Sequence, residues 1–293
     1  MTQRIVFITG ANSGIGKETA LQLARSSMTV VMGCRDLQRG EQAKADIQAI
    51  SASADVDLLQ LDLADFASIE RCVEQLGSRY DQIDVLINNA GLMSSQRSVT
   101  AQGFETTFGV NHLGHFYLTS LLEPMLSHAK NARVINVASV GHWLALGGIA
   151  FEDLQSELHY NSWTAYCRSK LANILFANEL ALRWADKQIV VHSLHPGIVG
   201  SDFGGNGDTT GFDSGLVRMG ARIAVSPATG SKTSVYLATQ PEGADPSRTG
   251  TYWVRSRPGV KSPWARSQLA GRRLWEHSER LVAQGRAAVL NGA

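Results

Sequence analysis

Tyr166 and Lys170, four residues apart, are the pair in this sequence best suited to acid–base chemistry. Apolar residues recur at helical spacing from Trp163 to Leu180, so we predict a helix that carries both side chains on one face. A free phenol, with a pKa of about 10, is a weak base at neutral pH. A nearby ammonium favours the phenolate, because unit charges about 4 Å apart interact by about 4 kcal/mol at an effective dielectric near 20. We therefore expect Lys170 to lower the Tyr166 pKa by about one to three units.

A glycine-rich turn near the N-terminus is suited to holding phosphate groups. The sequence IVFITGANSGIG (5–16) is typical of a buried strand, a turn and the start of a helix. We expect Gly10 to permit the tight turn, Gly14 to let the backbone approach a pyrophosphate, and Gly16 to let the helix pack close to the strand. A helix N-terminus favours an anion there. Such a turn can also be only a strand-to-helix connection, but its position after the first strand favours a dinucleotide site.

The end of the second predicted strand indicates which dinucleotide binds. Cys34 occupies the tip, where an acidic residue would bind a ribose 2′-hydroxyl, and Arg35 follows with a guanidinium that can clamp a phosphate. Lys17 and Arg39 can assist. We therefore predict NADP(H) over NAD(H). Asp36 is the counter-argument, since a shift of one residue in register would bring its carboxylate to the ribose, and the Arg-Asp pair could also be a plain surface turn.

The elements that must position these residues alternate along the first two-thirds of the chain. Strands are predicted at 4–8, 29–33, 56–60, 85–88, 133–138 and 189–194, and helices near 14–26, 38–50, 66–78, 101–128 and 163–185. Apolar strands alternating with amphipathic helices predict an α/β protein with a doubly wound, Rossmann-type fold. A helix near 228–239 and a strand near 250–254 would complete three α/β/α layers around a mostly parallel sheet of about seven strands.

Composition narrows the class of protein. The 293 residues are 44% apolar, which suits one domain spanning 1–293. A formal net charge of +1 gives no reason to expect nucleic acid or an anionic membrane as partner. Cys34, Cys72 and Cys167 lack the spacing of a metal site or disulfide framework and fit a reducing compartment. No apolar run reaches about 18 residues, so we expect no membrane span and a cytoplasmic protein.

Two segments interrupt the alternation. Residues 200–227 are rich in Gly, Ser and Asp, and we interpret them as a lid over the substrate, because the sheet pattern resumes afterwards. Residues 255–293 form a basic, Trp-bearing C-terminal extension. The extension could cover the pocket, contact a neighbouring molecule or lie on the surface, and the sequence does not choose among these.

With these motifs in order, the chain resembles the short-chain dehydrogenase/reductase family over nearly its whole length. The carrying motifs are TGANSGIG (9–16), Asp62-Leu63, NNAG (88–91), YCRSK (166–170) and HPG (195–197). Within the family, the phrases NHLGHF, AYCRSKLAN, SLHPG and RRLWEHSE are similar to those of retinol dehydrogenases. Membrane-bound members carry an N-terminal anchor, and the apolar run that opens this chain is too short to be one.

The resemblance implies a catalytic tetrad of Asn111, Ser139, Tyr166 and Lys170. Tyr166 would act as general acid in reduction and as general base in the reverse direction. Ser139, expected at the carboxyl edge of the sheet, can donate a hydrogen bond to the substrate oxygen as negative charge develops there. Asn111 would hold a water that links Lys170 to solvent. The positive charge of an oxidised nicotinamide would favour the Tyr166 phenolate in the same sense as Lys170.

The glycine turn and the resemblance together give the expected NADP(H) contacts. In the family, Asp62 and Leu63 would contact adenine. Ser201, preceded by Gly200, stands where the family places a hydroxyl near the nicotinamide carboxamide. The full set is Gly10, Asn12, Ser13, Gly14, Ile15, Gly16, Arg35, Asp62, Leu63, Asn89, Ala90, Gly91, Tyr166, Lys170, Pro196, Gly197, Ile198 and Ser201.

These residues predict an NADPH-dependent oxidoreductase that interconverts a ketone or aldehyde and its alcohol by hydride transfer. A bulky apolar substrate is indicated, because the expected pocket walls are apolar: Met93, Trp143, Leu144, Phe203 and Phe212. Two alternatives remain: reduction of a conjugated carbon–carbon double bond, as the family's light-dependent pigment reductases perform, and a non-catalytic NADP(H)-binding sensor. The intact tetrad favours an enzyme, and the physiological direction of the reaction stays open.

His112 and His115 flank Gly114 in the helix predicted over 101–128 and could suggest a metal site. No nearby carboxylate or cysteine completes one, so we predict packed histidines and no metal. Family members commonly pair through the helices that correspond here to 101–128 and 163–185. A homodimer or homotetramer is therefore expected from the resemblance.

Overall fold

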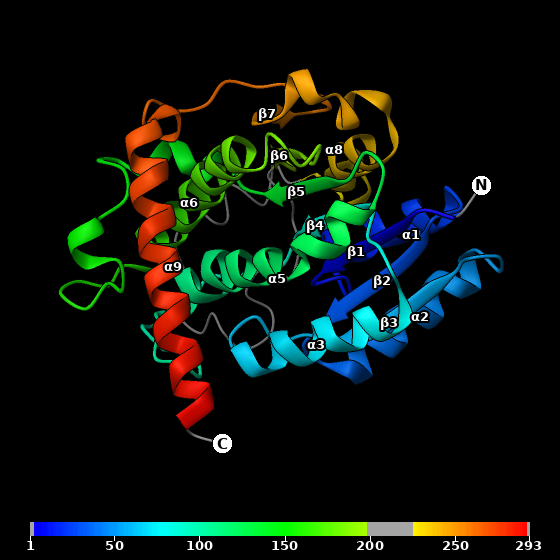
Figure 1. Ribbon diagram of the computed structural model, residues 1–293, viewed down its shortest axis with the longest axis horizontal. Coiled ribbons are helices and arrows are strands. Elements are labelled where there is room, and N and C mark those ends of the chain that lie inside the picture. The colour runs from blue at the N-terminus through cyan, green and yellow to red at the C-terminus, as the bar shows by residue number, and fades with distance from the viewer. Residues whose placement is uncertain (1–2, 198–224, 292–293) are drawn as a thin grey trace.

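The protein is organised around one twisted sheet (Figure 1). The computed structural model describes residues 3–197 and 225–291. Strand order across the sheet is β3-β2-β1-β4-β5-β6-β7-β8, and neighbouring strands run parallel except β7 and β8. The strands are β1 (Ile5–Thr9), β2 (Thr29–Cys34), β3 (Val56–Gln60), β4 (Val85–Asn88), β5 (Arg133–Val137), β6 (Val190–His195), β7 (Thr251–Val254) and β8 (Arg257–Pro258).

This sheet confirms the predicted doubly wound, mostly parallel fold with three α/β/α layers. The predicted number of strands, about seven, was one short. The additional strand is β8, two residues long, which folds back antiparallel on β7 at the edge of the sheet. So short a run carries no apolar alternation from which a strand could be predicted.

Helices connect the strands and cover both faces of the sheet. The long ones are α1 (Gly14–Arg25), α2 (Leu37–Ile50), α3 (Phe66–Arg79), α5 (Gly114–His128), α6 (Ser162–Arg183), α8 (Pro227–Thr239) and α9 (Gln268–Asn291). The short helix α4 (Thr106–Phe108) runs into α5 through a π-helical turn, η1 (Gly109–Leu113). The helix predicted over 101–128 thus begins five residues later. Glu105 caps it, because its carboxylate accepts hydrogen bonds of 2.7 Å from the backbone N of Thr107 and of Phe108.

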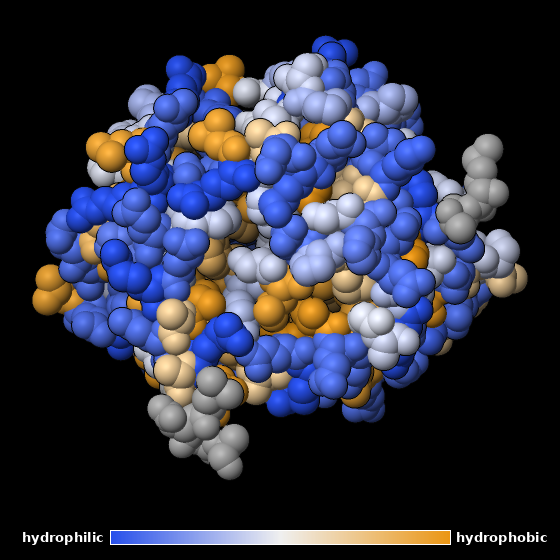
Figure 2. Space-filling view, viewed as in Figure 1, coloured by the Kyte–Doolittle hydropathy of each residue, from blue (hydrophilic) through white to orange (hydrophobic). Residues whose placement is uncertain are grey.

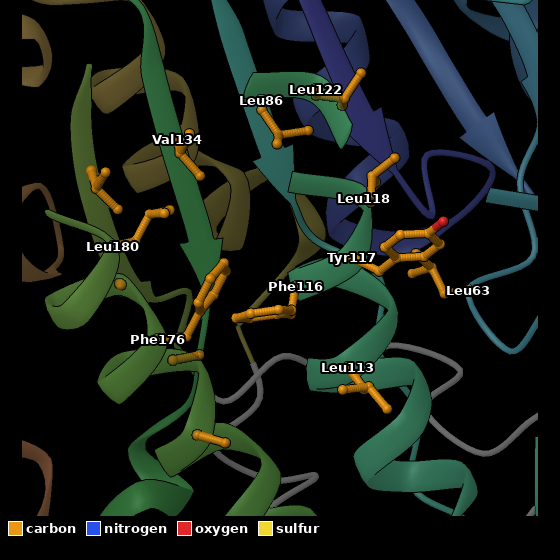
Figure 3. Packing of buried hydrophobic residues seen from close by; sticks show 14 of the residues in the cluster. Leu63, Leu86, Leu113, Phe116, Tyr117, Leu118, Leu122, Val134, Phe176 and Leu180 are labelled. Atoms are coloured by element: carbon orange, nitrogen blue, oxygen red, sulfur yellow. The ribbon is translucent and has the colours of Figure 1, made fainter. Parts of the chain in front are cut away.

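Two hydrophobic clusters hold the layers together, one on each face of the sheet. Val6 and Ile8 of β1 belong to the cluster beneath α1, α2 and α8, and Phe7 between them belongs to the cluster beneath α3, α5 and α6. Figure 3 shows the second cluster, in which Phe116 of α5 faces Phe176 of α6 with ring centroids 5.4 Å apart. The alternating strands therefore bury apolar side chains on both sides, as a parallel sheet requires.

The predicted C-terminal extension contains α9, a long helix that we did not predict from the sequence. Figure 1 shows α9 crossing the outer side of α5 and α6. Trp275 of α9 packs with its ring centroid 4.8 Å from that of Phe116 and 6.0 Å from that of Phe176, and the Arg183 guanidinium lies 4.5 Å from its ring. The described part of the extension packs on α5 and α6 and contributes no residue to the cleft described below, and contact with a neighbouring molecule stays a prediction.

The position of α9 bears on the predicted self-association. The two helices through which we expected copies to pair, α5 and α6, have α9 packed on their outer faces. The homodimer or homotetramer stays a prediction.

The surface over α9 is largely hydrophilic, and hydrophobic residues gather in a hollow beside it (Figure 2). Across residues 3–197 and 225–291, we find no helix with the length and apolar character needed to cross a membrane.

The predicted lid at 200–227 lies outside the described residues except for its last three. Of these, Ser226 caps α8, accepting a hydrogen bond of 3.3 Å from the backbone N of Thr229.

Gly114 opens α5 directly against the loop after β3, and this close approach can be tested. A Cβ added there would lie 2.4 Å from the Leu63 carbonyl oxygen, so the helix or the loop would have to move. We expect Gly114→Ala to lower the free energy of unfolding by about 1–3 kcal/mol. Urea denaturation with a two-state fit measures the change.

Gly77 of α3 provides the matched control, since nothing lies within 4 Å of a Cβ added there. Gly77→Ala should raise the free energy of unfolding by about 0.5–1 kcal/mol, because alanine loses less backbone entropy in a helix than glycine does. Stabilisation of both variants by similar amounts would show that α5 is not constrained at Leu63.

Candidate active site

A cleft of about 430 Å³ opens at the carboxyl ends of the strands, beside the turns that follow β1 and β4. The strand order reverses between these two strands, and open α/β sheets bind ligands at such a point. Of the predicted cofactor contacts, those lining the cleft are Gly10, Asn12, Ser13, Gly14, Ile15, Gly16, Arg35, Asp62, Leu63, Asn89, Ala90, Gly91, Tyr166, Lys170 and Pro196. Gly197 is described but does not line it, and Ile198 and Ser201 lie outside the described residues.

The glycine turn has the geometry that its sequence predicts. Gly10 and Gly14 have φ angles of +64° and +54°, in the left-handed region that favours glycine. A Cβ on Gly16 would lie 2.2 Å from the Gly10 carbonyl oxygen, so only glycine allows α1 to begin this close to the strand end. The Ser13 side chain makes no capping bond to α1. The N–H groups of the first turn are therefore available to an anion in the cleft.

Basic residues line the cleft beyond the tip of β2. Arg35 and Arg39 are both among its walls, together with Asp36. The Asp36 carboxylate caps α2 by accepting a hydrogen bond of 3.0 Å from the backbone N of Arg39. Lys17, which we expected to assist, instead pairs with Asp46 at 2.5 Å and does not line the cleft. The prediction that Lys17 assists at the cleft was therefore wrong, because its ammonium pairs with the Asp46 carboxylate of α2.

The four residues of the expected tetrad come together from three elements. Tyr166 and Lys170 lie one turn apart on α6, with the Lys170 Nζ 5.7 Å from the Tyr166 ring centroid. Ser139, directly beyond β5, makes a side-chain hydrogen bond with Tyr166. Asn111 lies in η1, and its Nδ2 donates to the Ser169 Oγ at 2.9 Å, next to Lys170. Tyr166 and Lys170 line the cleft, and Ser139 and Asn111 are not among its lining residues.

Asn111 also fixes the turn after β4. Its Oδ1 accepts a hydrogen bond of 2.8 Å from the Leu92 backbone N, and its Nδ2 donates one of 2.8 Å to the Leu92 carbonyl oxygen. A Cβ on Gly91 would lie 3.0 Å from the Lys170 Nζ and 3.3 Å from the Asn111 Oδ1. The side chain of Asn111 thus ties that turn to α6, which is more than the water-holding role expected from the resemblance.

The electrostatics of Tyr166 differ from the expectation. Burial raises the pKa of Tyr166 to about 12, and the hydrogen bond with Ser139 offsets only part of that rise. Burial also lowers the pKa of Lys170 to about 8. We predicted that Lys170 would depress the Tyr166 pKa, and the direction found is the opposite, because desolvation by burial is the largest influence on the phenol. At neutral pH the phenol is protonated.

Two histidines hold the loop that carries Ser139. The His142 Nδ1 donates to the Ser139 carbonyl oxygen at 2.7 Å, and its Nε2 accepts from the Ser262 backbone N at 3.2 Å. The Val140 backbone N donates to the His195 Nδ1 at 3.1 Å. Neither histidine was predicted as a site residue. The sequence signal was their place just beyond predicted strand ends, at the edge where ligands bind.

His112 and His115, considered above as metal ligands, are both buried and hydrogen-bonded. The His112 Nε2 lies 2.8 Å from the Ser278 Oγ of α9, and the His115 Nδ1 lies 3.0 Å from the Asn111 carbonyl oxygen. Among the residues that the structure describes, no group of three or more His, Cys, Asp or Glu side chains is arranged to hold a metal ion. Both rings therefore have structural partners within the fold.

Apolar side chains surround the catalytic groups. Met93 lines the cleft, and Trp143 and Leu144 are 39% and 56% exposed just beyond Ser139. Trp163, which we did not predict as a wall, is 43% exposed one turn before Tyr166, with ring centroids 6.0 Å apart. The other two predicted walls, Phe203 and Phe212, lie outside the described residues. Cleft residues absent from our prediction are mostly apolar: Leu61, Leu92, Val110, Val137, Ala138 and Pro227.

Comparison with known proteins agrees with this geometry. A family model described as short chain dehydrogenase matches residues 4–210, which is well over half of the chain. The chain belongs to the short-chain dehydrogenase/reductase family. It is 42% identical to retinol dehydrogenase 12 from Bos taurus over 279 residues (95% of this chain, 86% of that protein). It is 38% identical to retinol dehydrogenase 13 from Homo sapiens over 283 residues (95% and 84%). The predicted resemblance to retinol dehydrogenases is thus confirmed.

Two solved structures share the fold. The crystal structure of an uncharacterized protein from Mycobacterium paratuberculosis gives a TM-score of 0.74 at 34% identity, covering 96% of this chain and 93% of that one. The RhlG/NADP active-site complex from Pseudomonas aeruginosa gives a TM-score of 0.68 at 24% identity, covering 90% and 97%.

The buried histidines of this short-chain dehydrogenase make its stability depend on pH. Burial lowers the pKa of His112 to about 3, and those of His115 and His192 to about 4. In the unfolded chain, histidine titrates near about 6.5, so below that pH the unfolded state binds protons that the native state does not. Stability is then lost as the pH falls, by up to about 2 kcal/mol per histidine at pH 5. The buried Glu105 carboxyl, whose pKa is raised, offsets part of this loss.

Guanidinium denaturation at pH 7 and pH 5 measures the effect, and the midpoint should be clearly lower at pH 5. His128 is exposed, so His128→Asn is a matched variant that should leave the pH dependence in place. Equal midpoints at the two pH values would mean that the buried imidazoles take up protons without unfolding the protein.

Proposed function

We propose that this protein is an NADPH-dependent reductase of bulky apolar ketones or aldehydes. The observation that carries the proposal is the joined arrangement of Tyr166, Ser139 and Lys170 at a cleft whose other end is the glycine turn. Family membership supports oxidoreductase chemistry in general. The cofactor and the substrate class rest on the residues that line the cleft.

The protonation of the catalytic groups suits reduction. A bound nicotinamide dinucleotide supplies the hydride. Tyr166, kept protonated by its raised pKa, donates its proton to the carbonyl oxygen as negative charge develops there. Ser139 donates a hydrogen bond to the same oxygen. Lys170, mostly an ammonium at neutral pH, stabilises the phenolate that remains, and oxidation of an alcohol requires the same proton to move back.

Two features support NADP(H) over NAD(H). Arg35 and Arg39 line the cleft beyond β2, where a 2′-phosphate would lie. Asp36, the counter-argument from the sequence, uses its carboxylate to cap α2 and is thereby held toward the helix backbone. The complex of RhlG with NADP shows this fold with that dinucleotide in another protein.

The substrate class rests on the exposed apolar residues near Tyr166. Trp143 and Leu144 are partly exposed just beyond Ser139, Trp163 is partly exposed beside the Tyr166 ring, and Met93 lines the cleft itself. Apolar walls with a few convergent polar groups select a hydrophobic ligand and orient it by hydrogen bonding. The names of the retinol dehydrogenases support an isoprenoid alcohol or aldehyde, and steroid-like and aromatic carbonyls fit the same walls. A cytoplasmic location remains a prediction.

Replacing Tyr166 tests the proton donor. We expect Tyr166→Phe to bind NADPH with unchanged Kd and to lose turnover by about 100-fold or more, since it removes the proton source and little else. Tyr117 provides the control, because its hydroxyl bonds to Glu70 away from the cleft. Tyr117→Phe should keep its kcat. Near-normal turnover of Tyr166→Phe would refute the mechanism.

A substrate panel with NADPH absorbance as readout accompanies these variants. Ketones, aldehydes and α,β-unsaturated ketones of increasing apolar bulk are offered to the wild-type protein, and the products are identified. Alcohol products that depend on Tyr166 support the proposal. Saturated ketones formed from the unsaturated ones would favour double-bond reduction. NADPH binding with no turnover of any member would favour the sensor.

Arg35 tests the choice of dinucleotide. We expect Arg35→Ala to raise the Kd for NADPH by about 10–100-fold and to leave the Kd for NADH nearly unchanged, because a charge-assisted phosphate contact is lost. Lys17→Ala is the matched control, since its partner is Asp46 and it should leave both values unchanged. Tighter binding of NADH than of NADPH by the wild-type protein would overturn the assignment.

A further inference from the structure

A chain of hydrogen bonds, buried at Thr9 and His115 and partly buried at the turn after β4, connects that turn with the helix that carries Asn111. Thr9 ends β1, and its Oγ1 lies 2.9 Å from the backbone N of Asn89 and 2.9 Å from that of Ala90. The same oxygen lies 2.9 Å from the His115 Nε2. The His115 Nδ1 in turn lies 3.0 Å from the Asn111 carbonyl oxygen. Thr9, Asn111 and His115 are all essentially inaccessible to solvent.

Only one arrangement of protons satisfies every contact in this chain. A carbonyl oxygen can only accept, so the His115 Nδ1 carries a proton and donates it to Asn111. The backbone N–H groups of Asn89 and Ala90 donate to the Thr9 Oγ1, which uses both lone pairs. The Thr9 hydroxyl proton is then donated to the unprotonated Nε2 of His115. The ring is therefore neutral, in agreement with burial lowering its pKa to about 4.

The two ends of the chain contact the two halves of the site. Asn89 and Ala90 line the cleft next to the glycine turn, where the dinucleotide is proposed to bind. Asn111 lies in η1, and its side chain bonds to the Ser169 Oγ, beside Lys170. Turns of the π-helical type are rare in proteins, and those that occur are often found at functional sites. Movement of the β4 turn away from β1 would take the Asn89 and Ala90 N–H groups away from the Thr9 Oγ1, and losing these two hydrogen bonds would cost free energy.

We propose that His115 is a positioning residue that couples the dinucleotide-binding turn at Asn89–Ala90 to the backbone of Asn111. This rests on the proposed function, since it assumes that the cleft binds a dinucleotide. The coupling acts through Thr9, so His115 and Thr9 form one functional unit. Loss of either should loosen dinucleotide binding and displace Asn111 and Lys170 together.

His112, three residues earlier, provides the natural comparison. It is as buried as His115, but its bond goes to Ser278 of α9 and its ring packs 5.1 Å from that of Phe108. Within the described residues, none of the hydrogen bonds of His112 goes to the β4 turn. A histidine that only fills space or ties helices together should behave like His112 when replaced.

The test uses the full-length protein and four variants of the coupled unit: His115→Phe, His115→Asn, Thr9→Val and the double variant His115→Phe/Thr9→Val. Thr9→Ser and His112→Phe are the controls. The readouts are the Kd for NADPH by protein fluorescence, hydrogen–deuterium exchange of a peptide covering residues 86–92, the thermal midpoint, and kcat and KM on a substrate identified by the panel.

We expect His115→Phe and Thr9→Val each to raise the Kd for NADPH by about tenfold and to speed exchange at residues 86–92. Their effects on Kd should overlap, so the double variant should be within about threefold of the worse single variant. His115→Asn, which can still donate to the Asn111 carbonyl, should recover part of kcat. Thr9→Ser should match the wild type, and His112→Phe should lower the thermal midpoint while keeping the Kd.

The proposal is overturned if His115→Phe keeps the Kd for NADPH and the exchange of residues 86–92 within twofold of wild type. Independent, multiplying effects in the double variant would also overturn it. If His115→Phe does not fold, Thr9→Val and His115→Asn decide the matter with the same readouts. Because Kd and exchange need no substrate, failure of the reductase proposal on the panel remains distinguishable from failure of this coupling.

Discussion

The close approach of two turns, one after β1 and one after β4, is the constraint on which the whole site depends. The Asn89 Nδ2 donates to the carbonyl oxygens of Thr9 and Gly10, at 2.8 and 3.3 Å, and so joins the ends of two central strands. A Cβ on Gly10 would lie 3.0 Å from Ala90. Since each turn forms one wall of the cleft, the distance between them sets its width. Tyr166 and Lys170 then approach this fixed frame from α6.

Much of the fold was predictable because it follows from short-range patterns. Buried parallel strands are apolar on both faces, and the turn after β1 needs glycine at positions that the sequence displays. The environment of Tyr166 was not predictable in the same way. A Lys four residues away is visible in the sequence, but the burial that raises the Tyr166 pKa depends on how β5, α6 and the Ser139 loop pack. Spacing along a helix gives proximity, and desolvation requires the tertiary structure.

The helix α9 was missed for a related reason. Four buried residues of α9 recur at helical spacing: Leu274, Trp275, Ser278 and Val282. Many charged residues lie between them, and we therefore interpreted the segment as a basic extension. The partners of this stripe, Phe116 and Phe176, are far away in the sequence. Recognition of α9 as part of the core therefore requires knowing that α5 and α6 present Phe116 and Phe176 to it.

The hydrogen bond between Ser262 and His142 makes the catalytic loop depend on a late part of the chain. Ser262 follows β7 and β8 in the sequence, yet its N–H donates to the His142 ring that holds the loop presenting Ser139. A nascent polypeptide emerging from the ribosome would have its glycine turn, its tyrosine and its lysine long before that support exists. A chain that ends before Ser262 would therefore lack one of the hydrogen bonds that hold the catalytic loop in place.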